Sequence, residues 1–484
     1  MFARLLRAVW RERRQVPFGC TFCACGGISI VKNPSEIEIP HDAESKLGGR
    51  LDGSRPLSIR AVSTDDVPLG FLEIDRTVAG RCCGGIRASS TVSPAELRRL
   101  ARVMTLKCGY LGLAAGGAKA GILVPEAASP IERLAILRAF GVSFGPVLRS
   151  GIYSFGSDLG TNDDDIREIR RAAGLRVGAP TPSSSGAYAG LTVALATVAA
   201  LRARGHDPRG ARIAVQGFGS VGRAVVAALD REGARIVAVA TVQGTLHREA
   251  GIAVEELLRR WASEGDAVVT ADGTRPPHAA LEVHCDALIP CATTGAVDLE
   301  AARRVTAPVV VCGANDPFRD GAEAVLADRN VLVVPDFVAN GGGVLGSTLA
   351  AAGAASEEVE SFFRRRFAQR VASTIDEALA RGEPVTSLAE RKALRFLDAC
   401  ERAHASSQPA GLLPEALAPR PTPATRVVLA LEQSVRPFGK LRSLGPWLRP
   451  FAARRVEEIL ACGWAAGEGV EPAAPERAGA TGGS

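Results

Sequence analysis

The stretch Ile213-Ala-Val-Gln-Gly217-Phe-Gly219-Ser-Val-Gly222-Arg-Ala-Val-Val226 decides the fold of this chain. A short apolar segment leads into three glycines spaced as Gly-x-Gly-x-x-Gly, and a helical sequence follows them. Gly217 permits a tight turn, Gly219 lets the backbone approach a pyrophosphate, and Gly222 lets helix and strand pack closely. The helix N-terminus adds the positive end of its dipole. The order of strand, glycine turn and helix predicts dinucleotide binding, and a plain tight turn is the alternative.

The sequence around this stretch alternates apolar strands with helices. Strands are expected at residues 211–216, 236–240, 287–290, 309–312 and 331–334. This spacing is typical of a doubly wound parallel sheet. We therefore predict an α/β protein of two domains, an N-terminal α/β domain and a Rossmann-like dinucleotide-binding domain, with C-terminal helices returning to the first. The predicted parts are an irregular leader at 1–35, the first domain at 36–178, the Rossmann domain at 179–345, the returning helices at 346–404 and a basic, partly disordered extension at 405–484.

Length and charge exclude several classes of protein. A chain of 484 residues, 46% hydrophobic and 23% charged, is long enough for at least two domains. Its net charge of +6 comes from its flanks, since residues 1–14 carry five arginines against one Glu and residues 426–455 carry seven basic residues against Glu432. The remainder is net negative, so nucleic-acid binding is not predicted. No run of 18 apolar residues occurs, and no transmembrane segment is expected.

The eleven cysteines indicate a reducing compartment. Their number is odd, they are spread over the chain, and no secretory leader is recognisable, so we predict reduced thiols and a cytoplasmic protein. Cys20-x-x-Cys23-x-Cys25 could bind a metal, but it lacks a second pair or a nearby His, and no metal site is predicted. Cys83 and Cys312 are expected to be buried packing residues rather than a redox pair.

Two lysines, Lys107 and Lys119, are the strongest candidates for chemistry. Lys107 falls near the end of an amphipathic helix that begins at Ser93-Pro94, where Ser caps the helix and Pro occupies its first turn. There it can hold a carboxylate as a point charge. Lys119 follows Gly116-Gly-Ala118, so it can lose water and have its pKa lowered toward working pH. A pair of solvated lysines is the alternative.

Seven short motifs follow one another over residues 55–400. They are Gly84-Gly-Ile-Arg87, Met104-Thr-Leu-Lys107, Gly116-Gly-Ala-Lys-Ala-Gly121, Ser157-Asp-Leu-Gly-Thr161, Gly217-Phe-Gly-Ser-Val-Gly222, Gly313-Ala-Asn315 and Pro335-Asp-Phe-Val-Ala-Asn-Gly-Gly-Gly-Val344. In this order they resemble the glutamate/leucine/phenylalanine/valine dehydrogenases, and the ordered set is far more specific than any single motif. The resemblance implies that the first domain binds substrate and builds a homo-oligomer.

The resemblance also implies roles for individual residues. Lys107 would bind the substrate α-carboxylate, and Lys119 would be the catalytic lysine that activates water or stabilises the carbinolamine. Asp158 would exchange protons with the amino group. Asn340 would help place substrate and nicotinamide, and Asn315 would line the nicotinamide side of the cofactor site. Further cofactor-binding residues would be Gly217, Phe218, Gly219, Ser220, Val221, Gly222 and Thr241, and further substrate-binding residues would be Cys83, Gly85 and Ser347.

Two positions disagree about the substrate side chain. The glutamate enzymes of this family carry a lysine immediately before the glycine pair Gly84-Gly85, and that lysine binds the side-chain carboxylate; here the residue is Cys83. A neutral thiol cannot compensate for the desolvation of a second carboxylate. Ser347, seven residues after Asn340, matches the serine that binds the same group in glutamate enzymes. We give the missing cation more weight, because a hydroxyl also suits a neutral substrate.

The end of the second Rossmann strand leaves the choice between NAD and NADP open. An acid there would bind the adenosine ribose, but the chain reads Val239-Ala-Thr-Val-Gln-Gly244. Without that carboxylate, a repulsion against a 2′-phosphate is also removed, and Arg248 lies close behind in the sequence.

Taken with the resemblance, these residues predict NAD(P)-dependent reversible oxidative deamination of an L-amino acid to its 2-oxo acid and ammonia, with a neutral, apolar side chain. The reaction needs a hydride acceptor, water and a proton shuttle, which nicotinamide and a lysine–carboxylate pair can supply. The alternatives are a glutamate dehydrogenase with altered side-chain binding and a catalytically inactive nucleotide-sensing or assembly protein of the same fold.

Overall fold

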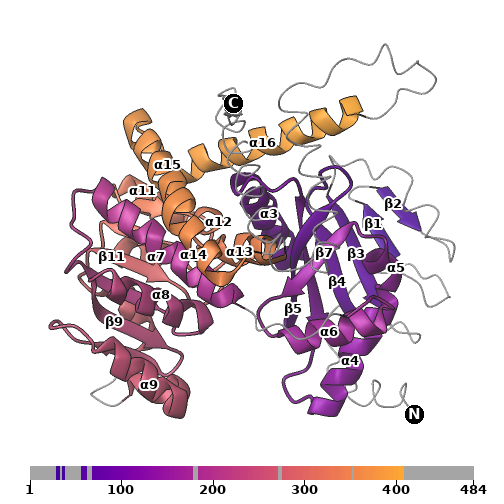
Figure 1. Ribbon diagram of the computed structural model, residues 1–484. Helices are drawn as coiled ribbons and strands as arrows, with labels where there is room; N and C mark the ends of the chain where they lie inside the picture. Colours follow the sequence, from indigo (N-terminus) through magenta and orange to yellow (C-terminus); the bar gives the residue numbers. More distant parts are fainter. Residues whose placement is uncertain are drawn as a thin grey trace, which may run out of the picture.

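The computed structural model describes residues 29–32, 35–38, 56–62, 68–177, 184–270, 275–351 and 354–407. Figure 1 shows two α/β lobes side by side, with the helix α16 (Val385–Ser407) running from the second lobe across the first. The cysteines of the leader and both basic flanks lie outside the described residues.

The first lobe is built on a seven-stranded mixed sheet in the order β2-β1-β3-β4-β6-β5-β7. β5 pairs in parallel with β6 and β7, whereas β4 pairs antiparallel with β6. The strands are β1 (Ser29–Lys32), β2 (Ser35–Glu38), β3 (Leu57–Val62), β4 (Pro68–Ile74), β5 (Cys82–Ser89), β6 (Gly116–Leu123) and β7 (Tyr153–Ser157). The irregular leader predicted to residue 35 is therefore wrong over β1, whose β-branched residues favour an added strand that pairs antiparallel with β3.

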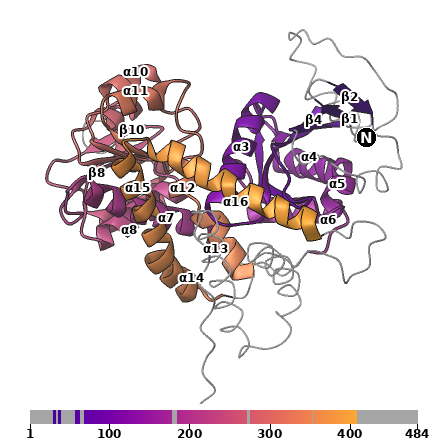
Figure 2. The same ribbon diagram turned by 90° about the horizontal axis from the view of Figure 1, so that it is seen from above.

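Helix α3 (Pro94–Tyr110) lies on the face of this sheet that looks toward the second lobe. The helices α4 (Pro130–Ser143), α5 (Gly145–Arg149) and α6 (Asp163–Ala172) cover the opposite face (Figure 2). The start of α3 agrees with the sequence, because Ser93 Oγ accepts a hydrogen bond from the Glu96 backbone N at 3.3 Å and Pro94 occupies the first turn. The helix ends at Tyr110 and so places Lys107 in its last turn.

The second lobe contains a six-stranded sheet in the order β10-β9-β8-β11-β12-β13. The five predicted parallel strands are present, each within one residue of the expected bounds: β8 (Arg212–Gln216), β9 (Arg235–Thr241), β11 (Ala287–Pro290), β12 (Val309–Val311) and β13 (Leu332–Val334). Strand β10 (Gly244–His247) was not predicted, and it folds back antiparallel onto β9. Because the strand order changes direction at β8, the glycine turn after β8 lies where open α/β sheets bind ligands.

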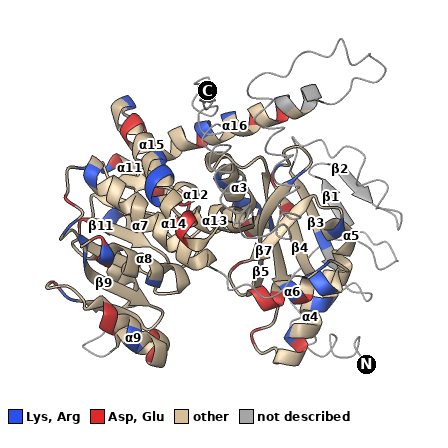
Figure 3. Ribbon diagram, viewed as in Figure 1, with Lys and Arg blue, Asp and Glu red and all other residues tan. Residues whose placement is uncertain are grey.

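Helices cover both faces of this second sheet. The helices α7 (Ser185–Ala203), α8 (Ser220–Arg231) and α9 (Val254–Glu264) pack on one face, and α10 (Leu299–Arg304) and α11 (Ala322–Asp328) pack on the other. Figure 3 shows charged residues, in blue and red, on α4, α6 and α9, while the strands between the helices are mostly tan. Each lobe therefore has its own apolar interior.

The C-terminal helices return to the first lobe only in part. The helices α13 (Gly342–Ala351), α14 (Ser356–Phe362) and α15 (Ala368–Arg381) follow the second lobe, and α13 and α15 pack on α7. α16 packs along α3, where Arg102 donates to Glu390 at 2.6 Å and Arg76 donates to Asp398 at 2.7 Å. The predicted return to the first lobe is thus confirmed for α16, and α15 also contacts α3, where Arg370 donates to Tyr110 O at 2.9 Å. The apolar faces of α13 and α15 find their main partner in α7.

Among the described residues, α7 is the one helix with the length and apolar composition of a membrane span. Of its apolar window, 67% is buried inside the protein. Its neighbours are α8, α13 and α15, so its composition is that of a central core helix.

A buried carboxyl group on β4 makes the stability of the first lobe depend on pH. Glu73 is 1% exposed, Ser58 donates a hydrogen bond to it at 2.5 Å, and Arg98 lies 3.4 Å away. Burial outweighs both partners and raises the pKa of Glu73 from 4.5 to about 7. Since the folded pKa lies above the unfolded one, the contribution of Glu73 to stability is fully present below pH 4.5 and is lost as the pH rises through about 7.

We expect Glu73→Gln to remove this pH dependence, because Gln keeps an acceptor for Ser58 and does not ionise. At about pH 8 the variant should be more stable than the parent by up to about 3 kcal/mol, and near pH 4 the two should be nearly equal. Urea unfolding of both proteins at the two pH values measures the difference. A difference that does not change with pH would show that Glu73 does not titrate in this range.

Candidate active site

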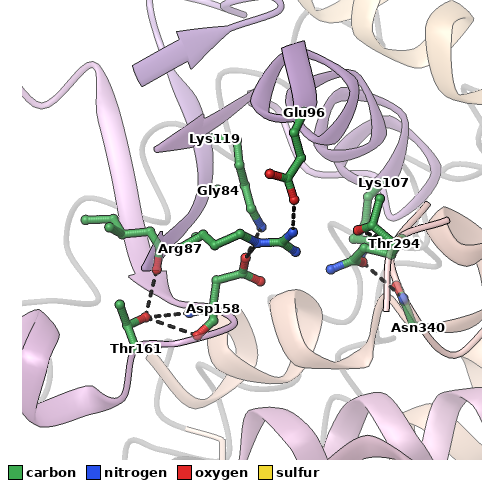
Figure 4. A network of polar contacts seen from close by, with 12 residues as sticks. Gly84, Arg87, Glu96, Lys107, Lys119, Asp158, Thr161, Thr294 and Asn340 are labelled. Carbon is green, nitrogen blue, oxygen red and sulfur yellow. Dashed lines mark hydrogen bonds and ion pairs between the residues drawn. The ribbon is translucent and has the colours of Figure 1, made fainter. Parts of the chain in front are cut away.

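The two candidate proton-transferring residues, Lys119 and Asp158, lie directly against each other. Lys119 is on β6 and Asp158 immediately follows β7, two strands that flank β5 in the sheet. The Lys119 Nζ is 3.0 Å from Asp158 Oδ2, and the two side chains are 3% and 13% exposed (Figure 4). An ammonium group and a carboxylate thus meet in a site largely shielded from solvent.

Asp158 has a second cationic partner, Arg87 on β5. The Arg87 Nε donates to Asp158 Oδ2 at 3.0 Å, and Nη1 of the same side chain contacts Glu96 on α3. Burial raises the pKa of Asp158, but the charges of Lys119 and Arg87 outweigh burial and lower the pKa to about 2. Asp158 is therefore ionised at physiological pH.

The backbone around Asp158 leaves little freedom for its position. A Cβ added to Gly85 would come within 2.8 Å of the Asp158 Cβ, so Gly85 makes room for this side chain. Thr161 Oγ1 accepts a hydrogen bond from Asp158 N at 2.9 Å and donates to Ile86 O at 2.7 Å. The hydroxyl of Tyr153 donates to Gly84 O at 3.1 Å. β5 and the segment after β7 are thereby fixed to each other around the carboxylate.

Lys107, in the last turn of α3, connects the two lobes. Its Nζ donates to Oδ1 of Asn315, in the loop after β12, at 3.0 Å. Asn340 donates from Nδ2 to the same oxygen and to Gly313 O, both at 3.1 Å. The structure thus brings Lys107, Asn315 and Asn340 together, although Lys107 and Asn315 are 208 residues apart in the chain. Figure 4 labels Lys107 and Asn340 in this cluster.

Burial controls the electrostatics of this cluster. Burial lowers the pKa of Lys107. The charge of Lys119 lowers this pKa further, whereas the charge of Asp336 raises it. Asp336, in the short helix α12 (Asp336–Ala339), accepts hydrogen bonds from two backbone N–H groups at 2.8 Å, and burial raises its pKa. Asn340 Oδ1 is buried and finds no hydrogen-bond partner among the described residues. This oxygen is therefore available to a ligand that donates a hydrogen bond.

Cys83 lies at the start of β5, half-buried. The charges of Lys107 and Lys119 both act on its thiol, so it belongs to the same site as the two lysines. Its Sγ is 3.1 Å from Sγ of Cys108, the residue after Lys107. Position 83, where the resemblance implies a lysine in glutamate enzymes, thus holds a thiol that is hydrogen-bonded to a second thiol.

The glycine turn after β8 has the shape expected of a dinucleotide site. Gly217 has a φ of +96°, which L side chains rarely adopt. A Cβ on Gly222 would come within 2.0 Å of Gly217 O, which accounts for the close packing of α8 on the turn. A Cβ on Gly219 would meet nothing within 4 Å, and α8 begins there without a side-chain cap. Free backbone N–H groups at a helix N-terminus beside open space fit the pyrophosphate of NAD or NADP.

Other predicted residues have surroundings of a different kind. Phe218 is 2% exposed and packs in the core, so its side chain points away from solvent. Ser220 is exposed at the start of α8 beside half-buried Val221. The Thr241 hydroxyl, at the end of β9, donates to Asp266 O at 2.7 Å. Ser347 is exposed on α13.

The sequence analysis gave no role to Arg87, Asp336 or Cys108. Each lies in or beside a motif that was recognised: Arg87 ends the Gly84–Arg87 motif, Asp336 follows Pro335, and Cys108 follows Lys107. A charged residue inside an otherwise apolar strand or buried turn was the available signal. Within the parts of the chain that the structure describes, no group of three or more His, Cys, Asp and Glu side chains could hold a metal ion.

The site combines a dinucleotide turn with a buried amine–carboxylate pair in the neighbouring lobe. A lysine and a carboxylate can transfer protons, whereas a nicotinamide supplies hydride chemistry that side chains cannot perform. The fold and the site together define a two-domain, nucleotide-dependent oxidoreductase.

The chain belongs to the Glu/Leu/Phe/Val dehydrogenase family. The family model described as glutamate/leucine/phenylalanine/valine dehydrogenase matches residues 184–398, and that of the family's dimerisation domain matches residues 64–173. The protein is therefore an NAD(P)-dependent amino-acid dehydrogenase.

Curated relatives with similar sequences are glutamate dehydrogenases. The chain is 32% identical to the NAD-specific glutamate dehydrogenase A of Halobacterium salinarum over 296 residues, which cover 58% of this chain and 68% of that protein. It is 33% identical to the glutamate dehydrogenase of Thermotoga maritima over 297 residues, which cover 58% of this chain and 71% of that protein.

Solved structures support the same fold. The hetero-hexameric glutamate dehydrogenase of Thermus thermophilus in a Leu-bound form has a TM-score of 0.63 and 28% identity, covering 77% of this chain and 93% of that one. The L-tryptophan dehydrogenase of Nostoc punctiforme has a TM-score of 0.53 and 21% identity, covering 75% of this chain and 99% of that one, and is evidence of fold alone.

Proposed function

We propose that this amino-acid dehydrogenase catalyses the reversible oxidative deamination of a neutral, apolar L-amino acid with NAD or NADP. The observation that carries the proposal is which partner each cationic side chain of the site has. Lys119 and Arg87 both form ion pairs with the Asp158 carboxylate, whereas Lys107 donates a hydrogen bond to the neutral amide oxygen of Asn315. Lys107 is thus the cation that one substrate carboxylate can take over from Asn315.

The thiol of Cys83 supports a neutral side chain. A second substrate carboxylate at this position would lose water and gain no ammonium in return, which costs several kcal/mol. An apolar side chain meets no such penalty beside sulfur, which behaves as a small hydrophobic group. Cys83 is thus proposed to border the substrate side chain, with Gly85 beside it.

The geometry supports a division of the proton steps between Lys119 and Asp158. With a pKa of about 2, Asp158 is a weak base, so its proposed role is to hold the substrate amino group and the Lys119 ammonium by charge. Lys119 then transfers protons to and from water and the substrate nitrogen. A bound nicotinamide would supply the hydride acceptor for the substrate Cα. Asn315 and Asn340 are proposed to position nicotinamide and substrate, the latter through its unpaired Oδ1.

The cofactor is proposed to bind along the turn from Gly217 to Gly222, with its adenosine ribose near Thr241. Gly217 N donates to Ala240 O at 2.9 Å, so the turn and the end of β9 are neighbours. Neither NAD nor NADP is favoured, because Thr241 offers no carboxylate to either ribose. We further propose a homo-oligomer built through residues 64–173, the part matched by the dimerisation-domain model. A cytoplasmic location stays a prediction.

A second candidate function is glutamate dehydrogenation. It is favoured by the names of the curated relatives, and Ser347 could then serve the side-chain carboxylate. A third candidate, a nucleotide sensor without catalysis, would have no use for the buried Lys119–Asp158 pair.

A substrate panel tests these candidates. We expect the purified protein to reduce NAD+ or NADP+ with leucine, valine, phenylalanine or tryptophan at a kcat/KM at least about tenfold above that with glutamate, a difference of about 1.4 kcal/mol in the transition state. Turnover with glutamate alone would contradict the neutral-substrate proposal. Cofactor binding without turnover of any amino acid would instead support the sensor.

A further inference from the structure

Two thiols from different elements of the first lobe face each other beside the lysines. Cys83 is on β5 and Cys108 is on α3, and their sulfur atoms are 3.1 Å apart. A disulfide needs about 2.05 Å between sulfurs, so a shift of about 1 Å would bring the two atoms to bonding distance. Cys83 is half-buried, whereas Cys108 is 0% exposed. Cys83 is therefore the residue of the pair that is partly exposed to solvent.

The surroundings favour the thiolate form of Cys83 over that of Cys108. The hydrogen bond between the two thiols lowers the pKa of Cys83 against the effect of burial, and the charges of Lys107 and Lys119 lower it further. The same hydrogen bond and burial raise the pKa of Cys108. An attacking thiolate and a resolving thiol are thus distinguished by their environments.

We propose that Cys83 and Cys108 form a reversible disulfide when the enzyme meets a peroxide, which makes the pair an oxidative modification site within the first lobe. The pair differs from Cys83 and Cys312, which the sequence analysis weighed and set aside as packing residues. The proposal concerns the thiols themselves and holds whichever amino acid is the substrate.

The reaction balances with one peroxide. The Cys83 thiolate attacks one oxygen of hydrogen peroxide, the O–O bond breaks, and the leaving hydroxide takes a proton to become water, leaving a sulfenic acid on Cys83. Cys108 sulfur then attacks the Cys83 sulfur, the S–O bond breaks, and the hydroxide leaves with the Cys108 proton as a second water. Two thiols are oxidised to one disulfide and one peroxide is reduced to two waters. A dithiol reductant reverses the change.

Tryptic mapping tests the proposal directly, because cleavage after Arg81, Arg87, Lys107 and Lys119 gives one peptide with Cys82 and Cys83 and another with Cys108. After treatment of the full chain with hydrogen peroxide and blocking of remaining thiols, we expect these two peptides to be joined and to have lost two hydrogen atoms together. Dithiothreitol should separate them.

The neighbouring Cys82 provides a matched control, since its Sγ donates to Ile152 O at 3.4 Å and alternation along β5 directs it to the other face of the sheet. Cys82→Ala should still give the joined peptides, whereas Cys83→Ala and Cys108→Ala should not. A disulfide inside the Cys82–Cys83 peptide, or oxygen added to Cys83 without joining, would overturn the proposal. If the other variants do not fold, the parent protein and the Cys82→Ala protein together decide between these outcomes, because only the parent can form a disulfide inside the Cys82–Cys83 peptide.

Discussion

Replacing Lys119 with Met should lower kcat by about 1,000-fold and leave the affinity for the nucleotide unchanged. The Lys119 ammonium is 3.0 Å from Asp158 in a site where both side chains are largely buried, and Met fills the same volume without a titratable group. The nucleotide turn is in the other lobe, so its shape does not depend on this side chain. Steady-state kinetics with the preferred amino acid and a fluorescence titration with NADH or NADPH measure the two quantities.

A second buried lysine supplies the matched control. Lys392 on α16 is 4% exposed, and its Nζ is 2.7 Å from Glu377 on α15. Lys392→Met breaks a similar ion pair that includes none of the candidate site residues, so it should reduce stability and change kcat by less than about threefold. If Lys119→Met kept kcat within tenfold of the parent, Lys119 would not be the proton-transferring residue. Equal losses in both variants would assign the effect to folding.

Cys83→Lys should turn substrate preference toward glutamate. The new ammonium would stand beside Lys107 and Lys119, where like charges repel unless an anion lies among them. A glutamate side chain supplies that anion, and a charge-assisted hydrogen bond contributes about 1.5–3 kcal/mol. We therefore expect the ratio of kcat/KM for glutamate over leucine to rise about 100-fold.

The control for this substitution is Cys83→Met, which removes the thiol and adds length without charge. Its ratio of kcat/KM for glutamate over leucine should stay within about threefold of that of the parent. Should the Lys and Met variants show the same preference, Cys83 would not border the substrate side chain. The apparent affinity for the nucleotide, measured in both variants, shows whether the fold is intact.

Local signals explain what the sequence predicted well. At Gly217 and Gly222 the turn has backbone requirements that only glycine meets, and the start of α3 is specified by a serine cap followed by proline. Parallel strands of the second lobe are continuous apolar runs, so their bounds were accurate to one residue. The helical character of residues 346–404 was also recognised. Where this span divides into separate helices, and which surface each helix packs on, depends on tertiary contacts.

Non-local contacts explain what the sequence could not provide. The hydrogen bond from Lys107 to Asn315 joins two residues that are 208 positions apart in the chain, and the periodicity of the sequence does not predict contacts over such a separation. Arg87 was visible as the end of a motif, yet its effect on Asp158 needs the registration of β5 with β7. The antiparallel β10 follows a short turn after Thr241 with no Asn-Gly or Asp-Gly signal. Each was settled by tertiary packing.

Helix α3 belongs to the interiors of both lobes. On one side the Gly117 N of the first sheet donates to Thr105 Oγ1 at 3.0 Å; on the other, Tyr110 OH lies 3.1 Å from Thr374 Oγ1 on α15. If either lobe unfolds, the other loses the packing that α3 provides. The two lobes should therefore unfold as one cooperative unit despite their separate sheets. A substitution in the first lobe, at Glu73 for example, then changes the population of intact nucleotide sites in the second.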